Sequence, residues 1–330
     1  MAQFTPMMKQ YFEIKNQHKD KILFFRLGDF YEMFFEDAIT ASKELEITLT
    51  GRDCGQEERA PMCGIPYHAA ESYIAKLIEK NYKVAICEQV EDPALAKGIV
   101  RREVIKIITP GTVIESSMLD ERVNNYLLSL YSDGRQAALS YTDLSTGEFY
   151  CTYADISDAA VVRNEINRIN PAEIISNTDF QDIKAAYSAY NILDKRYFDH
   201  EACERRLKRQ FGVSSLEGLG IDNETLLRST GALLLYLDDI QKVSLDNINY
   251  IKTYSISNFM VLDQSTRRNL ELSETIRGKS RKGALLSVID RTSTAMGGRK
   301  LKSWLEKPLL STVEINGRLD AVAELYDDFL

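Results

Sequence analysis

The segment from Phe24 to Asp37 constrains the fold more than any other, because a strand pattern changes into a helix pattern within a few residues. Residues 22–27 form an apolar run that predicts a buried strand, and Gly28 with Asp29 predicts the turn that ends it. From Glu32 onward one face recurs at helical spacing, which predicts a helix carrying Phe34, Phe35, Ala38, Ser42 and Leu45 on that face. We therefore expect a strand, a sharp turn and a helix, with Phe30 and Tyr31 at the junction.

Phe30 and Glu32, at that junction, admit two interpretations. Side chains at the start of such a helix are usually exposed, so Phe30 could be an apolar wedge that opens a base step from the minor groove, with the Glu32 carboxylate beside it as a hydrogen-bonding group. Alternatively, Asp29 and Glu32 form a capping box for the helix, and Phe30 folds back into the core. The spacing alone leaves both interpretations open.

The rest of the N-terminal part alternates strands and helices. Thr5 and Pro6 predict a helix start, and further patterns predict a strand at residues 47–50, a helix at 69–80 and strands at 83–88 and 104–108. Between them, residues 51–66 are expected to form a polar loop that holds Arg52 and Met62. Arg52 and Met62 are candidates for contacts near the same groove, and an ordinary surface loop is the alternative.

A second unit begins with three strands, predicted at residues 125–131, 136–142 and 148–153, the first two joined by an Asp133-Gly134 hairpin turn. A helix at 158–169, a strand at 173–176 and a helix at 179–187 follow, which suggests an RNase H-like sheet. Helices dominate from Asn223 onward, with segments at 225–241, 284–289, 297–305 and 313–329. The last helix reaches Leu330 without a stop signal, so we expect the sequence to be part of a longer chain.

Composition excludes several classes of protein. The 330 residues predict two or three domains, and 44% hydrophobic with 27% charged residues is typical of a globular chain. No apolar run approaches the roughly 20 residues of a membrane span, and the N-terminus lacks the pattern of a secretion signal, so we expect a cytoplasmic protein. The five cysteines and three histidines are scattered, which predicts neither disulfides nor a metal site.

The net charge of −8 argues against a nucleic-acid ligand, but the charge is unevenly distributed. Residues 252–307 contain twelve Lys or Arg against five Asp or Glu. This basic segment predicts packing and interdomain contacts, with a solvated helical face as the alternative.

Six motifs, at residues 4–11, 28–32, 63–68, 85–89, 108–112 and 262–271, follow one another along the chain. In this order they resemble the bacterial MutS family of mismatch-recognition proteins. The resemblance implies a multidomain α/β plus α fold: a mixed α/β mismatch-recognition domain at 1–112, a linker at 113–123, an RNase H-like connector at 124–245, and the beginning of a helical core and lever domain at 246–330. In that family the Phe-x-Glu motif reads mismatches, which assigns Phe30 as the residue that stacks on a mispaired base and Glu32 as its hydrogen-bonding partner.

The resemblance also implies partners and cofactors: duplex DNA with mismatches or small loops, a homodimer in the full-length protein, and a MutL-type repair partner bound through the connector. ATP and Mg are expected only in an ATPase domain beyond this span, and the resemblance implies a nucleoid-associated location within the cytoplasm. Gly278-Lys279-Ser280 does not complete a phosphate loop, because Ser273 stands where glycine is required and no strand precedes it. We therefore expect no enzymatic activity from this span.

Two other functions are consistent with the residues. The connector could make the chain a protein-interaction module of a repair assembly. An RNase H-like nuclease would require carboxylates for two magnesium ions, for which Asp143, Glu148 and Glu165 are candidates. Asp143 to Gly147 is also ordinary turn sequence, which is the alternative for those acids.

Overall fold

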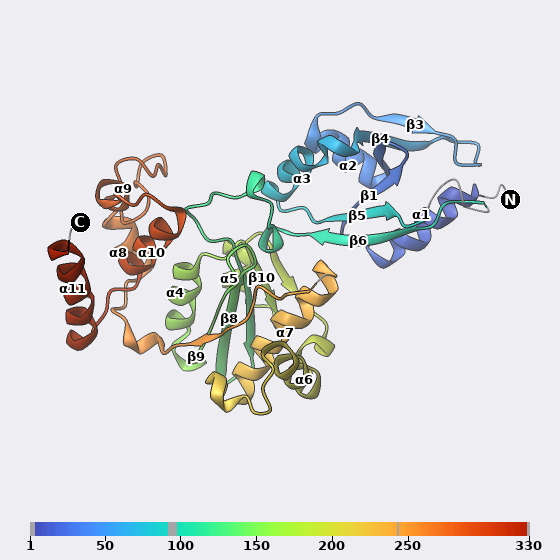
Figure 1. The fold of residues 1–330 in the computed structure, drawn as a ribbon. Helices are drawn as coiled ribbons and strands as arrows, with labels where there is room; N and C mark the ends of the chain where they lie inside the picture. Colours follow the sequence, from blue (N-terminus) through green and yellow to red (C-terminus); the bar gives the residue numbers. More distant parts are fainter. Residues whose placement is uncertain (1–3, 92–97, 243, 329–330) are drawn as a thin grey trace.

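A computed structural model describes residues 4–91, 98–242 and 244–328. It contains two six-stranded sheets, each covered by helices, and a C-terminal helical segment (Figure 1). The first sheet unit and the helical segment lie at opposite ends of the molecule, with the second sheet unit between them. The fold is thus multidomain, mixed α/β and then helical, as the sequence predicts. Within the described residues, no helix is both long and apolar enough to cross a membrane.

The first sheet is mixed, and among its described strands β1 and β5 are the one parallel pair. In spatial order its strands are β3 (Thr50–Arg52), β4 (Ala60–Pro66), β2 (Phe30–Phe34), β1 (Ile22–Leu27), β5 (Val84–Gln89) and β6 (Arg102–Ile108). Its helices are α1 (Pro6–Gln17), α2 (Phe35–Leu45) and α3 (Ala70–Glu79). Alternate residues of β1 serve two cores: Phe25 packs with α1, and Phe24 packs with α2 and α3.

The predicted helix start at Glu32 is wrong, because Phe30 to Phe34 form strand β2 and helix α2 begins only at Phe35. Gly28 adopts a φ of +56°, and Leu27 pairs with Phe30, so Gly28 and Asp29 form a two-residue hairpin turn. Burial alternates from Phe30 to Met33, with Phe30 exposed and Tyr31 buried, as expected for a strand. Asp29 and Glu32 therefore form no capping box.

The predicted loop at residues 51–66 is also wrong for most of its length. Residues 50–52 and 60–66 are strands β3 and β4, and only residues 53–59 connect them. The strand expected at 47–50 lies a few residues later. Strand β4 has Pro, Gly and Cys among its residues, and it is stabilised as a strand by pairing with both β2 and β3, a tertiary contribution that its sequence does not display.

The second sheet has the strand order of an RNase H-like fold, with three antiparallel strands followed by two parallel ones. In spatial order it comprises β11 (Tyr190–Ile192), β10 (Glu173–Ser176), β7 (Tyr126–Ser132), β8 (Gln136–Asp143), β9 (Glu148–Asp155) and a short β12 (Lys252–Thr253). Helices α4 (Ala159–Ile169) and α5 (Gln181–Ala186) pack on one face, and α6 (His200–Phe211) and α7 (Glu224–Gln241) pack on the other.

Helix α7 belongs to this second unit, since it packs against the sheet and α6 rather than against the helical segment that follows. Its Gly231 lets α6 approach closely, because a Cβ atom there would lie 2.3 Å from the Cβ of Cys203. Beyond its C-terminus, Lys242 donates to the carbonyl of Val104 in β6 (2.7 Å), so this part of the chain also contacts the first unit.

The helical segment comprises α8 (Gln264–Asn269), α9 (Leu285–Ile289), α10 (Ala295–Glu306) and α11 (Thr312–Asp327), and the predicted helix end at residues 329–330 lies outside the described residues. Besides a hydrogen bond from Arg122 to the carbonyl of Thr292 (3.3 Å), three contacts connect this segment to the linker between the two sheets. Arg122 pairs with Asp290 (2.9 Å), Arg281 pairs with Asp120 (2.5 Å), and Arg299 donates to the carbonyl of Glu121. We call these three contacts the linker clasp.

Candidate nucleic-acid interface

Phe30 projects from a rigid corner of the first sheet. Its side chain is 47% exposed, although it is the first residue of β2 and pairs with Leu27 on one side and Pro66 on the other. The backbone N–H of Tyr67 donates to the carbonyl of Asp29 in the hairpin turn (2.9 Å), which fixes the turn against the end of β4. The ring is therefore held at an edge where it can contact another molecule, and the interpretation that buries it in the core is wrong.

The strand register brings the four predicted residues onto one face of the sheet. Phe30 and Glu32 are two residues apart in β2, and Glu32 lies opposite Gly64 of β4. Met62 is two residues from Gly64 in β4, and Arg52 lies opposite Ala60 of the same strand. Residues directly opposite each other point to the same side, so all four side chains share a face. We call Phe30, Glu32, Arg52 and Met62 the reading corner.

Within the reading corner, Arg52 forms an ion pair with Glu32 across β4. The Glu32 side chain is 15% exposed and the Arg52 side chain is 38% exposed, so the pair is at the surface. Gly64 lies opposite Glu32, and a Cβ atom there would make only an ordinary contact, 3.5 Å from Cγ of Glu32. The carboxylate thus points along the sheet toward β3 and is neutralised by one arginine.

A second group of side chains braces the same hairpin, and the site predictions missed it. The Arg26 guanidinium lies 3.7 Å from the centre of the Tyr67 ring and pairs with Glu88 (3.3 Å). Tyr31 donates its hydroxyl to Glu88, and burial together with this bond raises the pKa of the Tyr31 phenol. Tyr67 and Glu88 fall in the motif runs 63–68 and 85–89, which are the signal that could have identified them.

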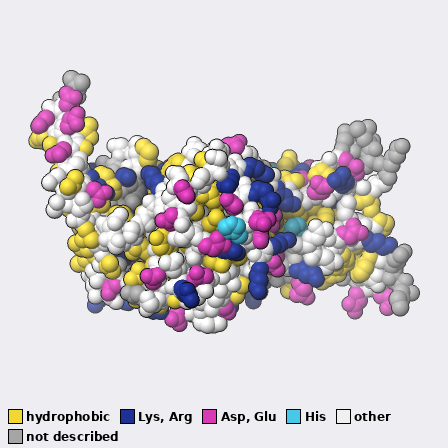
Figure 2. All heavy atoms as spheres, turned by 90° about the horizontal axis from the view of Figure 1, so that it is seen from below, with side chains coloured by type: hydrophobic (Ala, Val, Ile, Leu, Met, Phe, Trp, Pro, Cys, Tyr) yellow, Lys and Arg dark blue, Asp and Glu magenta, His cyan; other side chains and the backbone are white. Residues whose placement is uncertain are grey.

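The predicted basic segment is partly used for contacts within the chain. Arg281 and Arg299 belong to the linker clasp, whereas Arg268, Arg277 and Lys282 are exposed. On the face drawn in Figure 2, acidic and basic side chains are intermingled rather than separated. The basic segment is thus a set of interdomain contacts plus isolated surface charges, as the sequence predicts.

The proposed nuclease carboxylates are used in structural interactions. Asp143 accepts hydrogen bonds from the Asn125 backbone (3.1 Å) and from Asn124 (2.9 Å), and Glu148 accepts one from Asn124 (3.1 Å). Glu165 forms a two-pronged ion pair with Arg168 (2.6 and 2.9 Å). Among the described residues, no group of three His, Cys, Asp or Glu side chains is placed to hold a metal ion. The geometry gives the nuclease interpretation no support.

Comparisons with known proteins cover most of the chain. The family described as MutS domain I matches residues 5–117, MutS domain II matches 125–249 and MutS domain III matches 265–330. The chain is 52% identical to the DNA mismatch repair protein MutS of Lachnoclostridium phytofermentans and 53% identical to that of Clostridioides difficile. Each alignment covers 100% of this chain but only 36% and 35% of the relative. The chain therefore spans little more than a third of the length of these relatives.

Proposed function

This chain belongs to the MutS family, and from that premise we propose that it recognises mispaired or unpaired bases in duplex DNA with the reading corner. The observation that carries the proposal is the half-exposed ring of Phe30 on a braced hairpin, with Glu32 on the same face. The relatives that the chain resembles are named as DNA mismatch repair proteins, which supports the same conclusion.

The proposed mechanism is a test of how easily a duplex opens. An apolar wedge that enters from the minor groove must unstack a base step and kink the duplex, which costs roughly a few kcal/mol. A mispaired or unpaired base has already lost part of its pairing and stacking, so the same distortion costs less there. Phe30 then stacks on that base, and the preference arises from deformability rather than from base identity.

Glu32 adds discrimination through its charge. In the free protein, Arg52 neutralises the carboxylate. On DNA, phosphates compete for the same guanidinium, so on a paired duplex Glu32 faces a negative field without compensation. At a mismatch, an unpaired base edge offers an N–H donor to the carboxylate. We therefore assign Glu32 a penalty on paired DNA and a hydrogen bond at a mismatch, with Arg52 and Met62 as the neighbouring contacts on the sheet.

Dimerisation, binding of a MutL-type partner through the connector, and ATP hydrolysis with Mg are proposals for the longer protein. Gly278, Lys279 and Ser280 do not fit a nucleotide site, because they lie in an exposed turn between α8 and α9, where Thr275 N donates to the carbonyl of Ser280 (2.9 Å). We also propose the division of the chain at residues 112, 123 and 245, while the second sheet itself extends to Thr253.

The experiment compares binding of the chain to a duplex with one mismatch and to the matched duplex. Phe30→Ala should abolish the preference for the mismatch, a loss of roughly 5- to 100-fold, since stacking on an aromatic ring contributes about 1–3 kcal/mol per base. Ile105→Ala is a matched control, because Ile105 is 46% exposed on β6 at the far edge of the same sheet. Retention of the preference in Phe30→Ala would refute the proposal.

Glu32→Ala tests the second residue separately. It should raise the affinity for the matched duplex and narrow the preference, because it removes a repelling charge together with one hydrogen bond. A Glu32→Ala protein whose affinity for matched DNA is unchanged would remove the charge penalty from the mechanism while leaving the wedge intact.

A further inference from the structure

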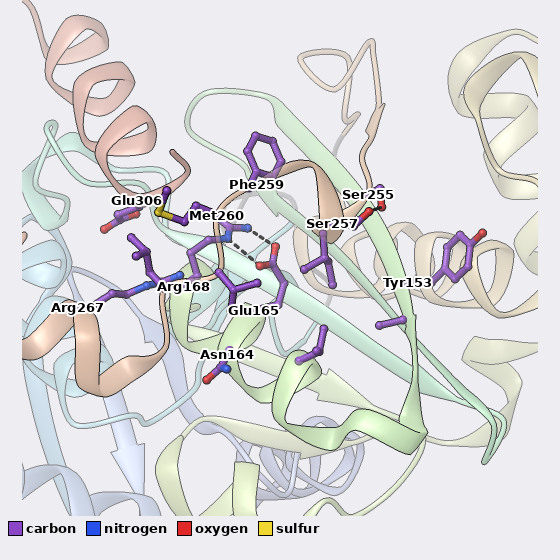
Figure 3. A pocket seen from close by; sticks show the side chains of 15 residues that line it. Tyr153, Asn164, Glu165, Arg168, Ser255, Ser257, Phe259, Met260, Arg267 and Glu306 are labelled. Carbon is purple, nitrogen blue, oxygen red and sulfur yellow. Dashed lines mark hydrogen bonds and ion pairs between the residues drawn. The ribbon is translucent and has the colours of Figure 1, made fainter. Parts of the chain in front are cut away.

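A cavity of about 330 Å³ lies where the second sheet unit meets the helical segment (Figure 3). Its lining comes from α4, from the end of β9, from residues 255–262, and from α8 and α10. Cavities of this size between structural units, apolar with a few polar groups, are where proteins most often bind ligands. None of its residues belongs to the reading corner.

The charged pair in the middle of the pocket is already satisfied. Glu165 and Arg168 form the two-pronged ion pair, and the Tyr254 hydroxyl also donates to Glu165. Burial opposes ionisation of Glu165, but the charge and hydrogen bonds of Arg168 lower its pKa below the usual value. This pair therefore forms the floor of the pocket, and its charges are already paired with each other rather than available to a ligand.

Arg267 is different, because one of its buried donors is unsatisfied, although the charge of the nearby Glu306 acts on its guanidinium. Its Nε–H is buried and has no hydrogen-bond acceptor, and its guanidinium forms no ion pair within the part of the chain that the structure describes. A buried donor on a charged group is costly to leave unpaired. A carboxylate from another molecule would satisfy it with a strong, charge-assisted hydrogen bond.

Glu306 lies on the same side of the pocket as Arg267 (Figure 3). Its nearest cation is Lys302 at 3.9 Å, which is too far for a hydrogen bond. Burial raises the pKa of Glu306, so this carboxyl is more readily neutral than an exposed one. It opposes an incoming anion less than a fully ionised carboxylate would.

Much of the remaining wall is apolar, although Asn164, Ser255 and Ser257 also line it, and the apolar surface continues out of the pocket. Ile256, Phe259 and Leu262 line the cavity, while Met260 and Val261 at its edge are 49% and 66% exposed. Methionine adapts well to varied apolar partners. An occupant that covers both the cavity and this edge is larger than the cavity alone.

We propose that this pocket binds a short segment of a partner protein in which a large apolar side chain lies next to a carboxylate. The apolar side chain fills the cavity, the carboxylate pairs with Arg267, and the neighbouring backbone covers Met260 and Val261. Two arginines and two glutamates among the lining residues give no basic surface for nucleic acid. The proposal goes beyond mismatch recognition and does not depend on it.

The test uses the chain with its methionine methyl groups labelled with carbon-13, so that the Met260 signal reports on the pocket. The probe is an acetylated, amidated tetrapeptide of glycine, phenylalanine, aspartate and glycine, compared with the same peptide carrying asparagine. We expect a saturable shift of the Met260 signal, with the aspartate peptide bound roughly tenfold more tightly. In the Arg267→Gln variant, the ratio of the affinities for the aspartate and asparagine peptides should be about one.

Arg268→Gln is the matched control, because Arg268 is the exposed neighbour on the same helix. Arg268→Gln should retain the roughly tenfold preference for the aspartate peptide. Ser257→Trp, at the edge of the pocket, should abolish binding of both peptides. No saturable shift at millimolar peptide, or an aspartate preference that survives Arg267→Gln, would overturn the proposal. Mismatch binding by Arg267→Gln should equal that of the unmodified chain, which separates this outcome from a failure of the reading corner.

Discussion

The reading corner and the floor of the pocket each contain a glutamate, an arginine and an aromatic ring, which are more exposed in the first site than in the second. In the reading corner, Glu32 pairs with an Arg52 that is 38% exposed, and the aromatic ring of Phe30 points to solvent. In the pocket floor, Glu165 and Arg168 are 7% and 10% exposed, and the hydroxyl of Tyr254 completes the network. We call Glu165, Arg168, Tyr254 and the nearby Lys307 the junction cluster.

This difference in burial determines which of the two ion pairs can exchange its partner for a ligand. In the junction cluster every charged oxygen is already bonded, and breaking one bond leaves a buried charge uncompensated. In the reading corner a phosphate or a base can replace the existing partner at little cost, because water already reaches the pair. The first arrangement stabilises the fold, and the second can read a ligand.

The largest expected effect is in the junction cluster. Arg168→Ala should lower the free energy of unfolding by about 3–5 kcal/mol, since it leaves the buried Glu165 without its cation. Urea unfolding followed by circular dichroism measures this loss. Arg163→Ala on the same helix is the control, because Arg163 and its partner Asp182 are 51% and 77% exposed and their pair contributes little. If Arg168→Ala lowered the free energy of unfolding by less than about 1 kcal/mol, the buried pair would be no more stabilising than an exposed one, which contradicts the comparison.

Lys307 provides a second test of the comparison, through the pH dependence of the free energy of unfolding. Its ammonium lies 4.0 Å from the centre of the Tyr254 ring, and burial, with the charge of Arg168 adding to it, lowers the pKa of Lys307 to about 7. The unfolded lysine keeps its proton up to about pH 10.5, so between these values the unfolded state binds more protons and the free energy of unfolding rises with pH.

We therefore expect the stability of the unmodified chain, measured relative to Lys307→Met, to rise by about 1–2 kcal/mol between pH 7 and pH 9. The comparison with the variant cancels the other groups that titrate in this range. Urea midpoints at the two pH values measure this change. If stability depended on pH in the same way in both proteins, Lys307 would remain protonated beside the Tyr254 ring and the expectation would be wrong.

The smallest effect on stability is expected in the reading corner. Arg52→Ala and Glu32→Ala should each change the free energy of unfolding by no more than about 1 kcal/mol, and the coupling between them in a double-mutant cycle should decrease as salt is added. A coupling as large as that of Glu165 with Arg168 would mean that the corner is built for stability, which contradicts its proposed role.

Much of the fold could be predicted from the sequence. The hairpin at Asp133-Gly134, the strands that follow and the helix start at Thr5-Pro6 all come from local turn and cap chemistry, and Thr5 indeed accepts from the backbone of Met8. Helix α6 was missed because its twelve residues contain few apolar ones, and it is stabilised by Cys203 and Leu207 packing on α7.

The four residues of the reading corner were candidates from the sequence, but their arrangement was not predicted. The sequence placed Phe30 and Glu32 at a helix start and Arg52 and Met62 in a loop. Only the pairing of β4 with both β2 and β3 puts them on one face, and pairing between distant segments leaves no local signal. The Arg52–Glu32 ion pair depends on that register.

The linker clasp has a consequence for the order in which the molecule is assembled during synthesis. Both sheets can form as they leave the ribosome, but Arg299 follows Glu121 by 178 residues, which takes roughly 10–40 s to synthesise at bacterial and eukaryotic rates. Until then the linker clasp lacks its last contact, so the clasp is completed only by residues translated long after the first unit has folded.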